Sequence, residues 1–256
     1  MSNQSVFQRY ELKYLINSKQ KSAVVDAMRS HMKEDEYGRS TICNIYFDAS
    51  NYLLIRHSLD KPVYKEKLRV RSYGVARSDS PVFVELKKKY KSVVYKRRIS
   101  MTEQEAMEYL CQKKHTGIQS QIGREIDYFF HFYGPLQPTV FLSYDREAYY
   151  QVSDENFRIT FDKNILWRDY DLSLEQGAYG TPLLDSGCTL MEIKTSGAIP
   201  LWLVSVLTNH HIYKTSFSKY GTAFQQILCG SLIQNGGFYD RKNIFGYIRQ
   251  PDYSGH

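Results

Sequence analysis

Residues 65–73 read Lys-Glu-Lys-Leu-Arg-Val-Arg-Ser-Tyr, and this stretch decides the expected fold. Its cations alternate with Leu68 and Val70, and a period of two places alternate side chains on opposite faces of a β-strand. An ordinary half-buried strand has one apolar face and one face of mixed polar residues. The second face of this strand is dominated by lysine and arginine, so the stretch predicts a β-strand with a strongly basic face.

The same alternation appears along most of the chain. Besides residues 65–73, it marks residues 7–16, 41–47, 82–89, 93–100, 140–149, 157–161 and 189–195. Helical patterns are fewer and lie at residues 18–32, 102–112, 119–132 and 219–233, with a further candidate at 199–208. Ser18 is the expected cap of the first helix, and Thr102 and Glu105 form a capping box at the start of the second. Together these patterns are typical of an α+β protein whose sheet is mainly antiparallel.

The composition is that of a folded protein and not of a disordered one. The chain has 256 residues, 42% of them hydrophobic, and a formal net charge of +7, which indicates an anionic partner. It shows no long repeat and no linker, so we expect one domain over residues 1–235 and a loosely ordered tail over residues 236–256. No apolar run approaches the ~20 residues of a membrane helix, and residues 1–13 are polar, so we expect a cytoplasmic protein.

The charged rows have a physical cost that depends on where their faces point. Like charges two residues apart on one strand face lie ~7 Å from each other, which costs about 2 kcal/mol at an effective dielectric constant near 20. A sheet with one solvated basic face would avoid this cost, because water and salt screen the charges. A sheet that curls its charged faces inward would instead surround a cavity with a strong positive field. Such a cavity suits a polyanion and its divalent cation.

Nine short elements, taken in their order along residues 7–224, resemble the VTC domain. The VTC domain is the catalytic domain of the vacuolar transporter chaperone, is found also as stand-alone bacterial proteins, and belongs to the triphosphate tunnel metalloenzyme superfamily. Any one element is a weak signal, but the ordered set is specific. The elements are Arg9-x-Glu11-x-Lys13-Tyr14, Ile45-Tyr46-Phe47-Asp48, Lys67-Leu68-Arg69-Val70-Arg71-Ser72-Tyr73-Gly74, Phe83-Val84-Glu85-Leu86-Lys87, Lys96-Arg97-Arg98, Tyr144-Asp145-Arg146, Arg158-Ile159-Thr160-Phe161-Asp162, Met191-Glu192-Ile193-Lys194 and Phe217-Ser218-Lys219-Tyr220.

The resemblance implies an eight-stranded antiparallel β tunnel with the polar strand faces inside and helices packed on the outside. The family makes inorganic polyphosphate: it transfers the γ-phosphoryl group of ATP to a growing chain and releases ADP, with a divalent cation that is typically manganese. Relatives in the superfamily hydrolyse triphosphates or cyclise ATP. The implied activity is a metal-dependent phosphotransferase that uses Mn²⁺ or Mg²⁺ and binds ATP, polyphosphate or another triphosphate. The chain shows no membrane segment, so a membrane partner would be a separate protein.

The resemblance and the charge pattern together nominate the site residues. Phosphoryl transfer depends on holding phosphates in line while their charge is neutralised, which the planar, permanently charged guanidinium group does well. The residues expected to take part in catalysis are Lys13, Arg69, Arg71, Arg146 and Lys219. Those expected to bind substrate are Arg9, Lys67, Lys87, Lys96, Arg98, Arg158, Lys194 and Ser218.

Carboxylate oxygens are the protein ligands that magnesium and manganese prefer. Glu192 is the first candidate ligand, because it matches the family's metal-binding glutamate. Glu11 and Glu85 come second, and Asp162 comes third. For Glu11 and Glu85 a second role stays open, which is to pair with neighbouring cations and hold them in place.

Alternatives also stay open for the chain as a whole. One is a metal-dependent triphosphatase that acts on tripolyphosphate or nucleotides, and another is a polyphosphate-binding module without turnover. Nucleic acid is the least expected partner, because the tyrosines alternate with the charged faces instead of stacking along them. Asp48 is expected to cap a turn before Ala49 and not to take part in chemistry.

Overall fold

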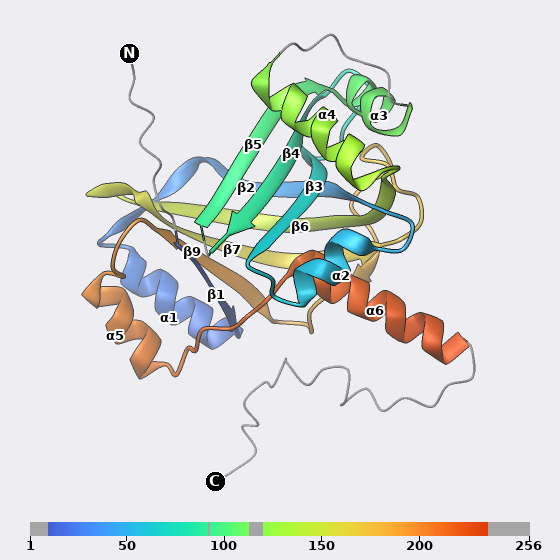
Figure 1. The fold of residues 1–256 in the computed structure, drawn as a ribbon. Helices are drawn as coiled ribbons and strands as arrows, with labels where there is room; N and C mark the ends of the chain where they lie inside the picture. The colour runs from blue at the N-terminus through green and yellow to red at the C-terminus, as the bar shows by residue number, and fades with distance from the viewer. Residues whose placement is uncertain (1–9, 92, 113–119, 235–256) are drawn as a thin grey trace.

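One antiparallel sheet forms the body of the protein in the computed structural model, which describes residues 10–91, 93–112 and 120–234 (Figure 1). Within these residues, eight strands follow one another in the order β1-β9-β7-β6-β2-β3-β4-β5, and the short β8 pairs with β7. The predicted α+β class with an antiparallel sheet is therefore confirmed. The strands are β1 Tyr10–Ile16, β2 Met32–Asp48, β3 Tyr64–Tyr73, β4 Pro81–Tyr90, β5 Val93–Thr102, β6 Gln137–Gln151, β7 Asp154–Arg168, β8 Thr181–Pro182 and β9 Thr189–Thr195.

The sheet curls until its two ends approach each other. In the sheet order β1 and β4 are separated by β9, β7, β6, β2 and β3. Even so, Lys87 Nζ of β4 lies 3.3 Å from Glu11 Oε2 of β1. A contact between strands so far apart in the order requires strong curvature, as in a barrel. The concave face therefore surrounds an interior, as the predicted tunnel requires.

Four helices cover the convex face in two pairs (Figure 1). The first pair, α3 (Glu103–Gln112) and α4 (Gln121–Tyr133), packs on the apolar residues of β2, β3, β4 and β5. The second pair, α1 (Ser18–Met28) and α5 (Leu201–Asn209), packs on those of β1, β7 and β9. Because one face of each strand is apolar and the other charged, covering the convex face with helices leaves the charged rows on the concave face.

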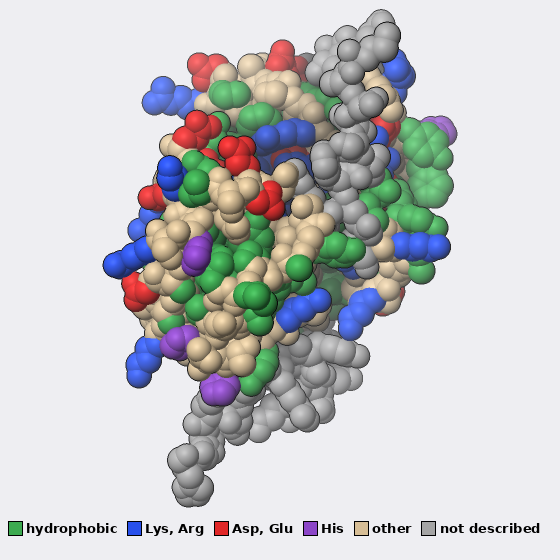
Figure 2. Space-filling model, turned by 90° about the vertical axis from the view of Figure 1, so that its left-hand side faces the viewer, with side chains coloured by type: hydrophobic (Ala, Val, Ile, Leu, Met, Phe, Trp, Pro, Cys, Tyr) green, Lys and Arg blue, Asp and Glu red, His purple; other side chains and the backbone are tan. Residues whose placement is uncertain are grey.

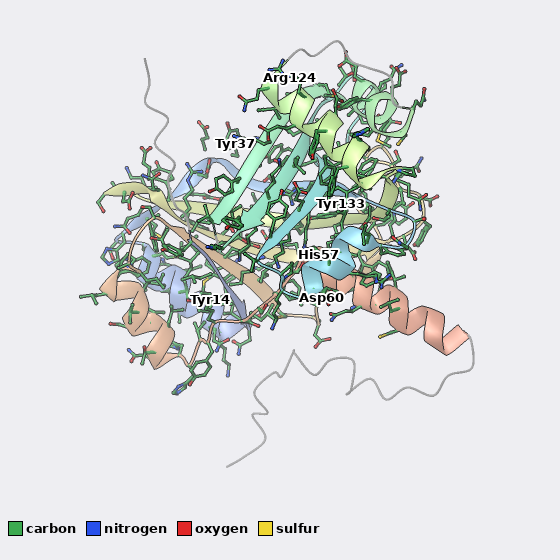
Figure 3. All side chains as sticks on the ribbon, viewed as in Figure 1. Tyr14, Tyr37, His57, Asp60, Arg124 and Tyr133 are labelled. Atoms are coloured by element: carbon green, nitrogen blue, oxygen red, sulfur yellow. The ribbon has the colours of Figure 1, made fainter. Side chains whose placement is uncertain are left out.

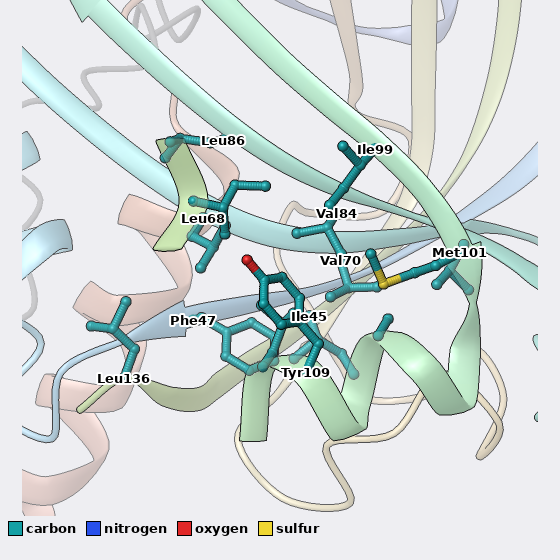
Figure 4. Packing of buried hydrophobic residues seen from close by; sticks show 14 of the residues in the cluster. Ile45, Phe47, Leu68, Val70, Val84, Leu86, Ile99, Met101, Tyr109 and Leu136 are labelled. Atoms are coloured by element: carbon teal, nitrogen blue, oxygen red, sulfur yellow. The ribbon is translucent and has the colours of Figure 1, made fainter. Parts of the chain in front are cut away.

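The packing under the first helix pair shows how the apolar strand faces are buried. Tyr109 of α3 lies against Ile45 and Val70 in a continuous cluster of buried side chains (Figure 4). Tyr133 of α4 reaches the sheet with its hydroxyl group, which donates to Glu66 Oε2 of β3 at 2.8 Å (Figure 3). Such burial is the main source of the sheet's stability.

The remaining two helices close one end of the interior. α2 (Leu53–Leu59) and α6 (Lys219–Gln234) lie against each other, and Tyr220 and Phe224 of α6 are buried with Leu142 on the concave side of the sheet. The interior is therefore apolar at this end and charged over the rest of its length. The charged part is where the predicted site residues meet.

The first helix and the strand after it differ from the sequence prediction. α1 ends at Met28 and not at residue 32, and its cap is Asn17 and not Ser18. Asn17 Oδ1 accepts from the Gln20 backbone N–H at 2.9 Å, and the Gln20 side chain accepts from Asn17 N–H at 3.0 Å. β2 begins at Met32, where the next residues are polar and largely exposed. Pairing with β6, and not burial of one face, makes that part a strand, so its sequence carries no alternation.

The short helix α2 is absent from the sequence prediction, because seven residues give too little helical periodicity to recognise. Its start is determined by Asp48, whose carboxylate accepts hydrogen bonds from the backbone N–H groups of Ala49 (2.8 Å), Leu54 (2.8 Å) and Ile55 (3.0 Å). Asp48 thus caps the turn, as expected, and also the first turn of α2.

Two of the predictions fall outside the described residues, namely the substrate-binding role of Arg9 and the loosely ordered tail over residues 236–256. In the described part of the chain, none of the helices combines the length and the apolar character needed to cross a membrane.

Candidate functional site

The charged rows predicted from the sequence meet on the concave face. Strand register places Lys13 of β1 opposite Glu192 of β9, and Arg69 of β3 opposite Glu85 of β4. In the space-filling view, Lys and Arg side chains lie in a hollow of the surface (Figure 2). Register and contacts bring together the cations of Lys13, Lys67, Arg69, Arg71, Lys87, Lys96, Arg98, Arg146, Arg158, Lys194 and Lys219, and the carboxylates of Glu11, Glu85, Asp162 and Glu192.

Glu85 is the centre of one group of contacts, which we call the Glu85 cluster and which also contains Arg69, Arg71, Lys96 and Arg98. The Glu85 side chain is 1% exposed, and its Oε2 accepts from Arg69 Nε at 2.9 Å and from Arg69 Nη2 at 2.7 Å. Its Oε1 lies 2.6 Å from Lys96 Nζ and 3.3 Å from Arg98 Nε. Arg71 Nη1 lies 3.9 Å from Oε2. Burial opposes ionisation of Glu85, but the surrounding cations outweigh it and lower its pKa.

Polar side chains from β2 and β6 aim the two arginines of this cluster into the interior. Tyr46 Oη accepts from Arg69 Nη1 at 3.1 Å. Asn44 Oδ1 accepts from Arg71 Nε at 2.9 Å, and Tyr144 Oη accepts from Arg71 Nη2 at 3.2 Å. The sequence prediction missed these three residues. Two of them sit opposite cations in the strand pairing, Tyr46 across from Arg69 and Asn44 across from Arg71, whereas Tyr144 pairs with Ile42. That pairing cannot be seen in one sequence.

On the other side of the interior, β1, β7 and β9 bring Glu11, Asp162 and Glu192 together. With Lys13, Arg146 and Lys219 they form what we call the three-carboxylate cluster. Lys219 Nζ lies 2.6 Å from Asp162 Oδ2 and 3.1 Å from Glu192 Oε1. Lys13 Nζ lies 3.2 Å from Glu11 Oε1 and 3.5 Å from Glu192 Oε1. Burial opposes ionisation of Glu11, but Lys87 and Lys13 lower its pKa to about 2, so the carboxylate is charged near neutral pH.

Asp162 is the most buried of the three carboxylates and the most tightly hydrogen-bonded. Its side chain has no exposed surface, and Arg146 donates two hydrogen bonds to it, from Nε to Oδ1 at 2.6 Å and from Nη2 to Oδ2 at 2.7 Å. Arg146 Nη2 also lies 3.5 Å from Glu192 Oε2. This paired geometry is the strong form of an arginine–carboxylate contact. Both Asp162 oxygens are therefore occupied by the protein itself.

The residues present fit a divalent cation that brings ligands of its own. Glu11 and Glu192 offer the hard oxygens that Mn²⁺ and Mg²⁺ prefer. Within the described ranges, however, no group of three or more His, Cys, Asp or Glu side chains is arranged to hold a metal ion. The donor set therefore suits a metal whose remaining ligands are phosphate and water oxygens.

Two interior lysines, Lys67 and Lys194, form no ion pair with a carboxylate of the described residues. Lys67 Nζ donates to Ser218 Oγ at 3.1 Å. Burial, reinforced by neighbouring cations such as Lys13, lowers the pKa of Lys67 to about 7. Burial, reinforced by Arg146, lowers the pKa of Lys194 to about 8. Both side chains are half-buried, and charging a partly desolvated lysine that lacks an ion pair is unfavourable, so a bound anion would stabilise the charged form of each.

Two further predicted residues lie towards the ends of the rows. Arg158 occupies an interior position in the register, opposite Lys194, but its side chain is 51% exposed and its Nη1 lies 3.4 Å from Asp35 Oδ2. Lys87 is 39% exposed and reaches Glu11 at 3.3 Å. These positions indicate contact at an opening of the interior and not at its centre.

A buried hydrogen-bond network positions the start of α6, which carries Ser218 and Lys219. Tyr220 Oη donates to Asp48 Oδ2 at 2.9 Å and lies 3.0 Å from Thr139 Oγ1. The Tyr220 ring stacks on Tyr46 with ring centres 4.6 Å apart. Asp48 is therefore linked, through Tyr220 and Tyr46, to Arg69 of the Glu85 cluster.

A family model described as "VTC domain" matches residues 8–228, most of the chain and all of the interior rows. The chain belongs to the VTC domain family. A search of curated protein sequences gives no match to this VTC domain.

Solved structures share the fold of this VTC domain. A "putative adenylate cyclase" from Bacillus halodurans is similar with a TM-score of 0.52 and 14% identity, over 82% of this chain and 95% of that one. The "putative adenylyl cyclase HpAC1" from Hippeastrum, described with a dominant triphosphatase activity, is similar with a TM-score of 0.52 and 16% identity, over 91% and 97%. At such identities the likeness establishes the tunnel fold alone.

Proposed function

We propose that this VTC domain is a polyphosphate polymerase that, with a divalent cation, transfers the γ-phosphoryl group of ATP to a polyphosphate chain and releases ADP. In this step a terminal phosphate oxygen of the chain forms a bond to the γ-phosphorus, and the bond from that phosphorus to the β-phosphate bridging oxygen breaks. The observation that carries the proposal is the excess of interior cations over carboxylates, with Lys67 and Lys194 half-buried and free of ion pairs among the described residues.

The Glu85 cluster is suited to hold phosphoryl oxygens. Arg69 and Arg71 are fixed by Glu85 and by the side chains of β2 and β6, so they lose little freedom when they bind an anion. We assign these two arginines to the transferred group, where spread negative charge must be neutralised. Lys96 and Arg98, which share Glu85, would bind neighbouring phosphates.

The three-carboxylate cluster is suited to hold the metal. We assign Glu192 and Glu11 as ligands, because their contacts with cations are longer, at 3.1–3.5 Å. Asp162 is held by Arg146 at 2.6 and 2.7 Å, and Glu85 is held by four cations, the nearest at 2.6 Å. A bound Mn²⁺ or Mg²⁺ would neutralise charge on the phosphate oxygens. The same two ligand carboxylates are in contact with Lys13, Arg146 and Lys219. When the metal binds to the carboxylates, these three cations would instead be neutralised by the phosphates that they contact.

The remaining interior cations would line the path of the chain. We assign this role to Lys67 with Ser218, to Lys194, and to Lys87 and Arg158 at the opening. Lys67 lies opposite Lys87 in the pairing of β3 with β4, and Lys194 lies opposite Arg158 in the pairing of β7 with β9. Each pair therefore offers two neighbouring cations to a polyanion. The same assignment extends to Arg9, which lies outside the described residues.

The test is to incubate the purified protein with ATP and MnCl₂ and to look for polymer. We expect phosphate chains of many units on a denaturing polyacrylamide gel and one ADP for each phosphate incorporated. An intact, folded protein that releases no ADP and makes no polymer with either Mn²⁺ or Mg²⁺ would overturn the proposal.

A second candidate is a metal-dependent triphosphatase, in which water replaces the chain as acceptor. The triphosphatase activity named for the Hippeastrum protein of the same fold favours it. The two candidates differ in product: the triphosphatase releases orthophosphate from tripolyphosphate and ATP and makes no chain. A non-catalytic polyphosphate-binding module would bind chains without releasing ADP or orthophosphate.

A further inference from the structure

A second hollow lies on the convex side of the sheet, away from the charged interior. It is a cavity of about 780 Å³ whose floor is formed by β6 and β7, with the start of α1 on one side and the segment before β9 on the other. Its size is within the range of small-molecule binding sites. Its lining includes Ser18 of α1, Ser143 and Asp145 of β6, Lys163 of β7, and Leu184 and Cys188 from the segment before β9.

The floor of this cavity is the back of the interior wall. Ser143 and Asp145 alternate with Tyr144 and Arg146, whose side chains contribute to the interior clusters. The pairing of β6 with β7 shifts register between Ser143 and Asp145, and Asn164 of β7 has a positive φ of 49°. A local irregularity of this kind re-aims side chains, and such features occur often beside functional sites.

One buried polar group in the floor, Ser143 Oγ, is unpaired in the part of the chain that the structure describes. Ser143 is 1% exposed, and its Oγ has no hydrogen-bond partner among the described residues. A buried hydroxyl group that is left unpaired costs free energy, because it has given up its bonds to water. Neighbouring groups are paired: Asp145 accepts from Thr41 Oγ1 at 2.8 Å and from Asn164 Nδ2 at 2.7 Å. Ser143 Oγ is therefore an unpaired donor and acceptor in the floor of the cavity, just beneath its surface.

The charge of the lining differs from that of the interior. Lys21 and Lys163 are balanced by Asp145 and Asp185, and both lysines also contact Glu147, Lys163 at 3.9 Å. Hydroxyl groups and aliphatic side chains supply the rest of the surface. A polyphosphate would meet as many carboxylates as cations here, so the lining disfavours it.

We propose that this cavity binds a small hydrogen-bonding molecule without net charge, of the size of a nucleoside or an amino acid, with a polar group on Ser143 Oγ. Aliphatic side chains such as Leu184 would cover its apolar part. The balanced lysines and aspartates suit a neutral or zwitterionic molecule, and the nucleoside and the amino acid are two sources of that one chemistry. The proposal does not depend on what the interior catalyses.

Binding is tested on the full chain without ATP, with adenosine in one arm and a mixture of neutral amino acids in the other. We expect saturable binding in one arm by calorimetry or ligand-observed NMR, and no displacement by tripolyphosphate, which enters the interior. Ser143→Ala should weaken that binding about tenfold, as expected for one hydrogen bond, without lowering the melting temperature, because it removes an unpaired buried group.

The matched control is Thr160→Val, which removes another buried hydroxyl group that has no hydrogen-bond partner within the described ranges, on the interior side of β7. It should leave the binding unchanged. As a second measurement, the ligand should slow alkylation of Cys188, which lines the cavity, and not of the exposed Cys111. The proposal is overturned if neither arm binds, if tripolyphosphate displaces the ligand, or if Ser143→Ala binds as well as the natural protein.

Discussion

The Glu85 cluster and the three-carboxylate cluster are built from the same residue types in different proportions. In the first, four cations surround one carboxylate; in the second, Lys13, Arg146 and Lys219, with Lys87 at its edge, contact three carboxylates. The first keeps the larger net positive charge, which suits phosphate, whereas the second is closer to neutral and can accept a divalent cation. The two clusters contain the same residue types, so the ratio of cations to carboxylates is what distinguishes them. That ratio makes the Glu85 cluster suited to anions and the three-carboxylate cluster suited to a metal cation.

The comparison also corrects an expectation about repulsion. From the sequence, the row of Lys67, Arg69 and Arg71 is a set of like charges whose repulsion, if the row faces inward, a bound polyanion with its divalent cation would relieve. In the structure, Glu85 offsets the two arginines before any ligand binds. Lys67 receives no such carboxylate from the described residues, and its lowered pKa reflects this. The unrelieved charge is thus confined to particular lysines.

The largest expected effect is that of removing an arginine from the Glu85 cluster. Arg69→Ala should lower the rate of ADP release from ATP by about 100-fold or more, the usual cost of losing one group that stabilises the transition state. The melting temperature should change little, because Glu85 keeps Arg71, Lys96 and Arg98 as partners. Arg97→Ala is the matched control, since Arg97 pairs with Glu125 at 3.2 Å, outside the cluster. Equal losses in both variants would contradict the assignment.

The next effect separates the two clusters by their response to metal. Glu192→Gln should raise the Mn²⁺ concentration needed for half-maximal activity by about tenfold, in line with the usual loss on altering a metal site. Glu85→Gln should reduce activity but leave that concentration within about twofold, because Glu85 is enclosed by cations. Metal titrations of both variants at saturating ATP make the comparison. If Glu85→Gln shifts the metal response and Glu192→Gln does not, the two sides have been assigned the wrong way round.

A smaller effect is expected at the network that supports both clusters from α6. Tyr220→Phe keeps the ring that stacks on Tyr46 but loses the hydrogen bonds to Asp48 and Thr139. The free energy of unfolding in a urea titration should fall by about 1–3 kcal/mol, because Asp48 loses a buried partner. Tyr213→Phe is the control, as Tyr213 is 65% exposed and should be neutral. An unchanged stability of Tyr220→Phe would mean that the network does not hold α6 in place.

The smallest expected effect is a proton taken up when the anion binds. The pKa of Lys67 is lowered to about 7, so at pH 8 most of it is neutral in the free protein, and a bound polyanion should raise its pKa and charge it. Calorimetry of tripolyphosphate binding at pH 8, in buffers of different ionisation enthalpy, should show net proton uptake. Lys67→Met should reduce the uptake by up to about one proton, and the uptake should vanish well below pH 7. If Lys67→Met takes up as many protons as the natural protein, a group other than Lys67 is responsible for the uptake.

Much of the fold could be predicted from local patterns. Alternation along residues 65–73 and 82–89 predicted β3 and β4 with their charged faces, and the capping box of Thr102 and Glu105 marks the start of α3 in the structure. The prediction of secondary structure failed where the local sequence shows no periodic pattern. α2 is too short for periodicity, and the first part of β2 is a strand only because β6 lies beside it.

For the site, the limit of prediction was the partner of each residue. The alternating charged strand faces and the family resemblance predicted Arg69 and Glu85 as site residues, but only the strand register shows that the two residues face each other. Asn44, Tyr46 and Tyr144 carry no charge pattern, and their contribution depends on the strands across from them. A pattern of period two gives the face of a strand, not its neighbour.

The amino-acid order alone was enough to specify which side chains share a strand face, because alternation is a property of the backbone of each strand. Which carboxylate meets which cation was decided only when the sheet curled and brought β1 close to β4, and when α6 inserted Lys219 between Asp162 and Glu192. The reason is that electrostatic interactions in a buried interior depend on distances of a few ångströms between residues far apart in the chain, and those distances exist only in the folded protein.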